Sequence, residues 1–155
     1  AWYIKSTTRA RDGLYTYDAV GRLHDAQLTR MGKQSRSKVD DLNNYIKKGA
    51  LGRAFENPHR TVVLIDEIDK ADIDFPNDLL RELDEQRFNI EETGEEIKAN
   101  YPPIVFVTSN DEKDLPDAFL RRCLFYYIEF PYAQLTNIVQ AHFSESDSDL
   151  VEGAV

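Results

Sequence analysis

An apolar run that ends in two adjacent acids constrains the fold of this chain most. Residues 61–67 read TVVLIDE, so five apolar or β-branched positions are followed at once by Asp66 and Glu67. A parallel strand covered on both faces has a continuous apolar sequence of this kind. Ligands of open α/β sheets gather at the carboxyl ends of the strands, where the two acids would lie. One carboxylate can hold Mg²⁺ or its waters while its neighbour accepts a proton from a water. A strand followed by an ordinary polar turn would give the same pattern.

A second apolar run is also followed directly by polar residues. Residues 104–107 read IVFV, and Thr108, Ser109 and Asn110 follow directly. Because the carboxyl ends of parallel strands meet at one edge of a sheet, we expect this small polar cluster beside the two acids. Residues 115–122, LPDAFLRR, then lead into a third apolar run over residues 124–130.

Together these segments closely resemble the AAA+ ATPases, and within them the MoxR-type branch. The resemblance covers residues 1–143, with ordered motifs at suitable spacings. The matching segments, in chain order, are GLYTYDAVGRLHDAQ (13–27), YIKKGALGRAF (45–55), VVLIDEIDKAD (62–72), FPNDLLRELDE (75–85), FNIEETGEEI (88–97), PPIVFVTSN (102–110) and LPDAFLRRCLFYYIEFP (115–131).

The resemblance implies a role for each polar residue. Asp66 would be the Walker B aspartate that positions Mg²⁺ on the β and γ phosphates of ATP through water, and Glu67 would polarise the attacking water. Asn110 would be sensor 1, which holds that water or the γ-phosphate. Arg121 and Arg122 match the arginine finger, whose planar guanidinium acts on a neighbouring subunit's nucleotide. The sequence does not decide between the two arginines, although we favour Arg121 with Arg122 in support, and surface ion pairs would also explain both.

The DEIDK pattern continues beyond the two acids. Asp69 and Lys70 fit the family's sequence at this point, but an exposed ion pair describes them equally well.

The phosphate-binding loop that such an ATPase needs is missing from the sequence. G-x-x-x-x-G-K-[ST] cradles phosphates with its backbone amides, whereas the Gly32-Lys33 pair here is followed by Gln34. In the resembling family this loop and the first strand precede the segment that the chain covers, and a helical lid with the sensor 2 arginine follows near residue 150. We therefore expect the chain to be the middle of an ATPase module and to be inactive by itself.

Alternation of strands and helices predicts an α/β fold with a parallel sheet. Strands are expected at residues 2–5, 61–65, 104–108 and 124–130. The resemblance implies a three-layer αβα, P-loop NTPase-like sheet with strand order 5-1-4-3-2, incomplete here because the first strand, the P-loop and the lid are missing.

Helices and loops are expected between these strands. Patterning predicts a helix within residues 15–28, a mobile basic loop at 29–38, a helix from Val39 that Gly49 ends, and a helix with Pro76 in its first turn. Residues 88–97 resemble a β-hairpin, and a last helix is expected at 132–143. In domain terms, residues 1–143 form a partial AAA+ core and residues 144–155 a linker or the start of the lid.

Composition excludes several classes of protein. With 41% hydrophobic and 30% charged residues the chain is typical of a globular domain, and no apolar segment approaches the ~18 residues of a membrane span. A single cysteine, Cys123, excludes an internal disulfide framework and suits the cytoplasm.

Charge is distributed unevenly along the chain. Residues 1–60 carry 12 Lys/Arg against 6 Asp/Glu, whereas residues 61–155 carry 7 against 22. The split could indicate nucleic-acid binding by the first part, the weakest interpretation, or a ring in which unlike faces meet. A solvated face is favoured because the basic residues alternate with Asp40, Asp41 and apolar positions, but the charge alone does not decide.

Two hypotheses about function therefore compete. In the first, the intact protein is a Mg²⁺-dependent ATPase, assembled as a ring (usually a hexamer), that remodels or matures a protein client. Residues 19–27 and 88–97 occupy the positions of family insertions that could grip the client, and a von Willebrand factor A-domain protein is a frequent partner of the family. In the second, the chain is a non-hydrolysing subunit that lends an arginine finger in trans.

Overall fold

A computed structural model describes residues 1–33 and 35–142 of the chain. It divides into two compact units, residues 1–123 and a unit that begins at Leu124, and each is described by itself. No helix within the described residues is long and apolar enough to cross a bilayer. The expected linker or lid segment at 144–155 lies outside the described residues.

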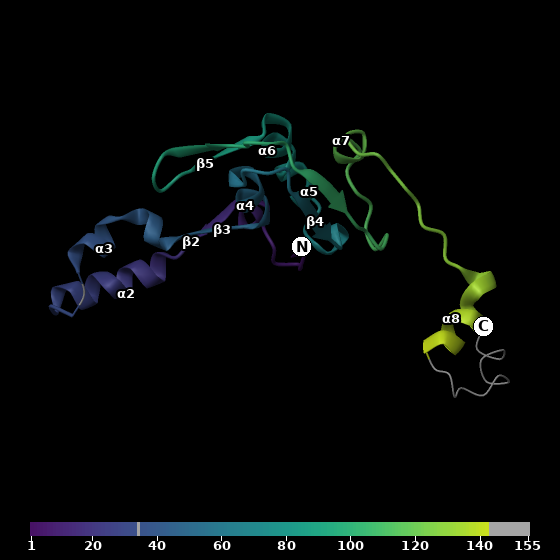
Figure 1. Cartoon of the computed structure of the whole chain (residues 1–155), viewed down its shortest axis with the longest axis horizontal. Coiled ribbons are helices and arrows are strands. Elements are labelled where there is room, and N and C mark those ends of the chain that lie inside the picture. Colours follow the sequence, from purple (N-terminus) through teal and green to yellow (C-terminus); the bar gives the residue numbers. More distant parts are fainter. Residues whose placement is uncertain (34, 143–155) are drawn as a thin grey trace. The chain divides into compact units, whose positions relative to one another are not determined.

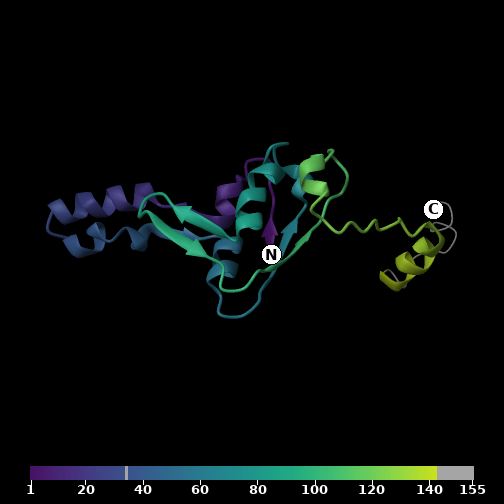
Figure 2. The ribbon, with the colours of Figure 1, turned by 90° about the horizontal axis from the view of Figure 1, so that it is seen from above.

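A parallel three-stranded sheet forms the centre of the first unit, as the sequence predicts. Its strands are β1 (Trp2–Tyr3), β4 (Val62–Asp66) and β7 (Ile104–Val107), and their order in the sheet is β1-β4-β7. β4 is central and pairs in parallel with both neighbours, with Ile65 opposite Val107. The α/β fold class is confirmed, and the sheet is consistent with part of a P-loop NTPase-like core (Figures 1 and 2).

The core lies on one face of this sheet. Val63 and Ile65 of β4 are buried, whereas Val62, the first residue of the strand, is 59% exposed. Phe106 on β7 is also 59% exposed. We expected the apolar run at 61–65 to be covered on both faces of the sheet, and for the described residues this prediction is wrong. A continuous apolar sequence can form such a strand, but other segments must supply the helices that cover its second face.

Short helices contribute to the core on this side of the sheet. These are α1 (Ala10–Leu14), α4 (Ala50–Glu56), α5 (Phe75–Asp78), α6 (Leu80–Glu85) and the 3₁₀ turn η2 (Ile68–Lys70). Pro76 lies in the first turn of α5, as predicted, where its missing N–H costs nothing. Gly52 lets α4 approach α1 closely, because a Cβ there would lie 2.0 Å from the Leu14 carbonyl oxygen.

The expected hairpin is confirmed. β5 (Arg87–Ile90) and β6 (Glu95–Lys98) pair antiparallel, with Phe88 and Ile97 opposite each other on the buried side. Gly94 adopts a φ of 72° in the turn, a backbone conformation that glycine accepts without steric cost.

Residues 15–48 form a helical arm that differs from the sequence prediction. The arm consists of β2 (Tyr15–Tyr17), α2 (Ala19–Arg30), α3 (Arg36–Asp40), η1 (Leu42–Tyr45) and β3 (Ile46–Lys48). β2 and β3 pair antiparallel, and Figure 1 shows α2 and α3 side by side beyond this ribbon.

Three predictions are corrected within the arm. The helix expected within residues 15–28 is present as α2, but it starts only at Ala19 and continues to Arg30. Tyr15–Tyr17 is a strand instead, because it pairs with Ile46–Lys48, which lies far away in sequence. The loop expected at 29–38 is shorter, since α2 continues to Arg30 and α3 begins at Arg36. Gly49 ends no helix and instead precedes α4 as its N-cap. Periodicity alone could not distinguish these short segments.

The second unit also differs in part. Its helix is confirmed as η3 (Tyr132–Gln134) and α8 (Leu135–His142), but residues 124–130 form no strand. A strand needs a neighbour to satisfy its backbone hydrogen bonds. Within the described residues this apolar, β-prone segment has no ladder partner.

Candidate nucleotide-hydrolysis site at the carboxyl edge of the sheet

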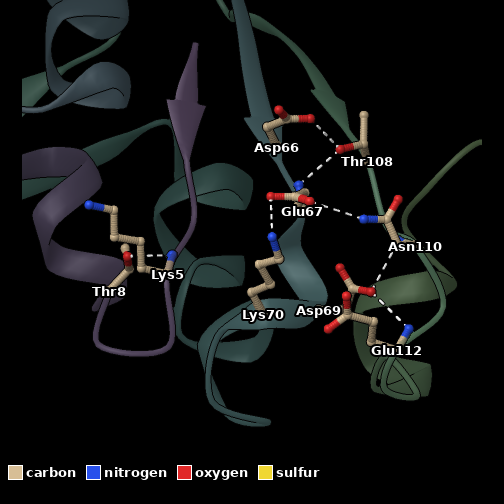
Figure 3. Close-up of polar contacts among 9 residues, drawn as sticks. All are labelled: Lys5, Thr8, Asp66, Glu67, Asp69, Lys70, Thr108, Asn110 and Glu112. Atoms are coloured by element: carbon tan, nitrogen blue, oxygen red, sulfur yellow. Dashed lines mark hydrogen bonds and ion pairs between the residues drawn. The ribbon is translucent and has the colours of Figure 1, made fainter.

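Residues following β4 and β7 meet at one edge of the sheet. The parallel register, with Ile65 opposite Val107, brings Asp66 and Glu67 beside Thr108 and Asn110. Figure 3 shows these four side chains directed toward one another. The sequence prediction that the two acids and the polar cluster lie together is thus supported by the geometry.

Thr108 connects the two acids. Its hydroxyl donates to Asp66 Oδ1 over 2.6 Å and accepts from the Glu67 backbone N–H over 2.9 Å. Its carbonyl accepts from Ile68 N–H over 2.9 Å. The threonine therefore fixes both the direction of the Asp66 carboxylate and the backbone of Glu67. Its place directly after the strand was visible in the sequence, but this bridging role was not.

Glu67 adopts an unusual backbone conformation. Its φ of 59° and ψ of 53° lie in the left-handed region, which costs a non-glycine residue about 1 kcal/mol or more. Hydrogen bonds on both sides of the residue, from Glu67 N–H and Ile68 N–H to Thr108, hold it there. The sharp turn ends β4 and leaves the carboxylate at the sheet edge instead of continuing along the strand.

Both oxygens of the Glu67 carboxylate are engaged. Oε1 accepts from Asn110 Nδ2 over 3.1 Å, and Oε2 accepts from Lys70 Nζ over 2.7 Å. The hydrogen bond to Glu67 raises the pKa of the Lys70 ammonium. An open cavity of about 560 Å³ adjoins the pair, lined by Tyr3, Ile4, Lys5, Ser6, Glu67, Lys70, Glu112 and Lys113.

Asp69 is not the exposed partner of Lys70 that one interpretation of the sequence offered. It is 2% exposed, and one oxygen, Oδ2, accepts the backbone N–H groups of Asn110 (3.0 Å) and Glu112 (2.9 Å). Burial alone would raise the pKa of this carboxyl, but backbone hydrogen bonds, that of Glu112 foremost, outweigh it and hold the pKa below its ordinary value. Nothing in the sequence signalled this role.

The two arginines lie apart from these contacts, around the end of α7 (Asp117–Leu120). Arg122 Nε bonds Asp84 over 3.1 Å, and its Nη1 donates to the Ala118 carbonyl over 2.6 Å. The exposed Arg121 side chain makes no hydrogen bond or ion pair with any other residue that the structure describes. Neither arginine bonds Asp66, Glu67 or Asn110 within that part of the chain.

The edge suits a hard cation. Asp66 Oδ1 accepts a hydrogen bond from the Thr108 hydroxyl, whereas Oδ2 makes no hydrogen bond to a described residue. Residues 1–33 and 35–142 contain no cluster of three or more His, Cys, Asp or Glu that could enclose a metal. A single directed carboxylate matches Mg²⁺, which keeps several waters and shares phosphate oxygens in ATPases.

Comparison with known families identifies the fold. Residues 13–123 match the model of the AAA domain, dynein-related subfamily. The chain belongs to this AAA family. The match spans the sheet strands β4 and β7 and all the polar residues at their carboxyl ends, so the AAA+ resemblance is confirmed. AAA domains generally bind ATP with Mg²⁺ and typically form rings. The search of curated proteins found no match.

Proposed function

We propose that the intact protein containing this chain is a Mg²⁺-dependent AAA+ ATPase of the MoxR type. It works as a hexameric ring in the cytoplasm and uses ATP hydrolysis for chaperone-like remodelling or maturation of a protein client, with a von Willebrand factor A-domain protein as the candidate partner. The hydrogen bond between Asn110 Nδ2 and Glu67 Oε1 carries the proposal, because it joins a candidate base to a water-orienting amide beside Asp66.

Each residue has a chemical task in this proposal. Asp66, directed by Thr108, holds Mg²⁺ through water, and the bound ion neutralises charge on the phosphate oxygens of ATP. Glu67 orients the attacking water and accepts its proton, for which its carboxylate must exchange one of its two present partners for that water. Asn110 holds the same water or the γ-phosphate from the adjacent strand end. Because phosphoryl transfer depends mostly on positioning and charge neutralisation, rigid strand ends suit these groups.

The arginine finger is assigned to Arg121. Its exposed guanidinium makes no hydrogen bond or ion pair with a described residue, whereas Arg122 bonds Asp84 and the Ala118 carbonyl. An uncommitted side chain can reach the nucleotide of a neighbouring subunit without first breaking an ion pair. Arg122 then supports the end of α7.

Glu67→Gln in the intact protein tests the proposal. The amide keeps the size of the side chain but cannot accept the proton, so Mg²⁺-dependent hydrolysis should fall about 100-fold or more while ATP binding persists. Glu56→Gln, a change at an exposed glutamate on α4, is the matched control. Wild-type protein without hydrolysis would contradict the proposal. Stimulation of a separate, P-loop-bearing subunit through Arg121 would then support a non-hydrolysing role.

A further inference from the structure

The buried carboxylate of Asp69 is a charged group that the proposed mechanism does not use. A carboxylate removed from water is costly unless hydrogen bonds replace its hydration. Asp69 is 2% exposed, and its Oδ2 accepts the backbone N–H groups of Asn110 and Glu112. The second oxygen, Oδ1, is buried and makes no hydrogen bond to a described residue. Hydrogen bonds to the 110–112 segment replace part of the lost hydration of this carboxylate, and they also fix where that segment lies.

The two bonds of Asp69 fix a strained segment. Asn110 and Glu112 donate to the same oxygen, and Asp111 between them adopts a left-handed φ of 62°. A non-glycine residue at this φ needs surrounding contacts to remain there. The Asp69 carboxylate supplies a pair of them, and Figure 3 shows both bonds converging on its side chain.

Asp69 also belongs to the element that carries Glu67. The turn η2 (Ile68–Lys70) starts directly after Glu67, and its first residue, Ile68, is bonded to the Thr108 carbonyl. The two partners of the Glu67–Asn110 hydrogen bond are thus tied to each other twice, once through Thr108 and once through Asp69. Loss of the second tie would leave the Asn110 backbone without its hydrogen bond to η2.

We propose that Asp69 is a positioning residue that holds the Asn110 side chain at the distance at which it meets Glu67. Its negative charge matters as well as its shape, because a hydrogen bond from a backbone N–H to an ionised oxygen is about twice as strong as one to a neutral oxygen. The kinetic consequence rests on the proposed ATPase function, whereas the geometric role does not.

Asp69→Asn separates charge from shape. The amide keeps one acceptor oxygen for the two N–H groups but must place its Nδ2 where Oδ1 is buried without a partner. Hydrogen–deuterium exchange resolved to single amides, measured on the full chain, should show Asn110 and Glu112 exchanging about tenfold faster. The Ile68 amide, which is bonded to Thr108, should keep its rate. Asp72→Asn is the matched control, since Asp72 is exposed three residues further along the chain.

Kinetics of the intact protein supply the second readout. With Asp69→Asn, kcat for ATP should fall about 10- to 100-fold while KM and ATP affinity stay within about twofold, because a misplaced Asn110 affects the reacting geometry more than binding. A purely structural role would lower kcat only in proportion to the folded fraction, which thermal unfolding measures.

The outcomes are distinguishable. Faster exchange at both amides with a selective loss of kcat supports the proposal. Unchanged exchange at Asn110 and Glu112 overturns it, whatever the kinetics show. If the wild-type protein does not hydrolyse ATP, the proposed function fails, and the exchange rates still decide whether Asp69 positions the segment. Faster exchange together with an unchanged kcat in an active enzyme overturns the link between this segment and catalysis.

Discussion

Asn110 Nδ2 donates to Glu67 Oε1 over 3.1 Å, across two neighbouring parallel strands. The two residues are 43 positions apart in the sequence. Their contact depends on the register of β4 and β7, on the left-handed backbone of Glu67 and on the Asp69 hydrogen bonds.

Asn110→Ala should lower kcat of the intact protein about 100-fold, because loss of one preorganised hydrogen-bond donor has an effect of that order. The measurement is steady-state ATP hydrolysis with thermal unfolding in parallel. Asp114→Ala changes a nearby exposed side chain that makes no hydrogen bond to a described residue, and it should leave kcat within about threefold of the wild type. Equal losses for both variants would indicate general disturbance of the segment and contradict a specific role for the Asn110 amide.

Thr108→Val should lower the free energy of unfolding by about 1–2 kcal/mol, since it removes the hydroxyl that bonds Asp66 and leaves the Glu67 N–H without its acceptor. It should also raise the Mg²⁺ concentration needed for half-maximal activity, because Asp66 loses its fixed direction. Denaturant unfolding and a Mg²⁺ titration measure the two effects. Thr108→Ser retains the hydroxyl, and its failure to preserve the wild-type Mg²⁺ requirement would argue against this account.

Arg121→Ala should abolish ring-dependent hydrolysis without changing the melting temperature, whereas Arg122→Ala should lower the melting temperature slightly through loss of the contacts with Asp84 and Ala118. Mixing inactive Arg121→Ala subunits with inactive Glu67→Gln subunits tests action in trans. Mixed rings contain interfaces with an intact base on one side and an intact finger on the other, so activity should return. No recovery across mixing ratios, with mixed rings shown to form, would refute the assignment of the finger.

Asp25→Asn should loosen the helical arm and leave the sheet unchanged. Asp25 Oδ2 bonds Lys38 Nζ and the Tyr45 hydroxyl, each over 2.9 Å, and so ties α2 to α3 and η1. The Lys38 contact, followed by that of Tyr45, lowers the pKa of Asp25. A depressed carboxyl pKa contributes stability that is present above the unfolded-state value near 3.8 and is lost as pH falls through the folded-state value.

Amide exchange across the arm as a function of pH measures this contribution. In the wild type, protection of α2 should decrease as pH falls below about 3.8, while in Asp25→Asn it should already be low at pH 7 and respond less to acid. Asp40→Asn, at an exposed carboxylate within the same arm, is the control. Identical pH profiles for wild type and Asp25→Asn would show that this carboxylate does not hold the arm together.

Long apolar runs and the residues after them were predictable from the sequence. The runs ending at Asp66 and Val107 are β-strands that pack on a core, and parallel pairing of the two strands brings their carboxyl ends together. For that reason Asp66, Glu67 and Asn110 could be placed at one edge of the sheet. The hairpin at 88–97 followed from its alternating apolar residues and its turn, and the AAA family from the order and spacing of the motifs.

Tertiary structure alone decided the remaining features, because they depend on partners that are distant in sequence. Tyr15–Tyr17 is a strand since Ile46–Lys48 pairs with it, and residues 124–130 are not a strand within the described residues because no neighbour offers a ladder. Asp69 and Lys70 follow one another in the sequence, yet one is buried beneath the 110–112 segment and the other bonds Glu67. Local sequence determines which residues can form a strand or a charge pair, whereas the packed structure determines which partner each of them meets.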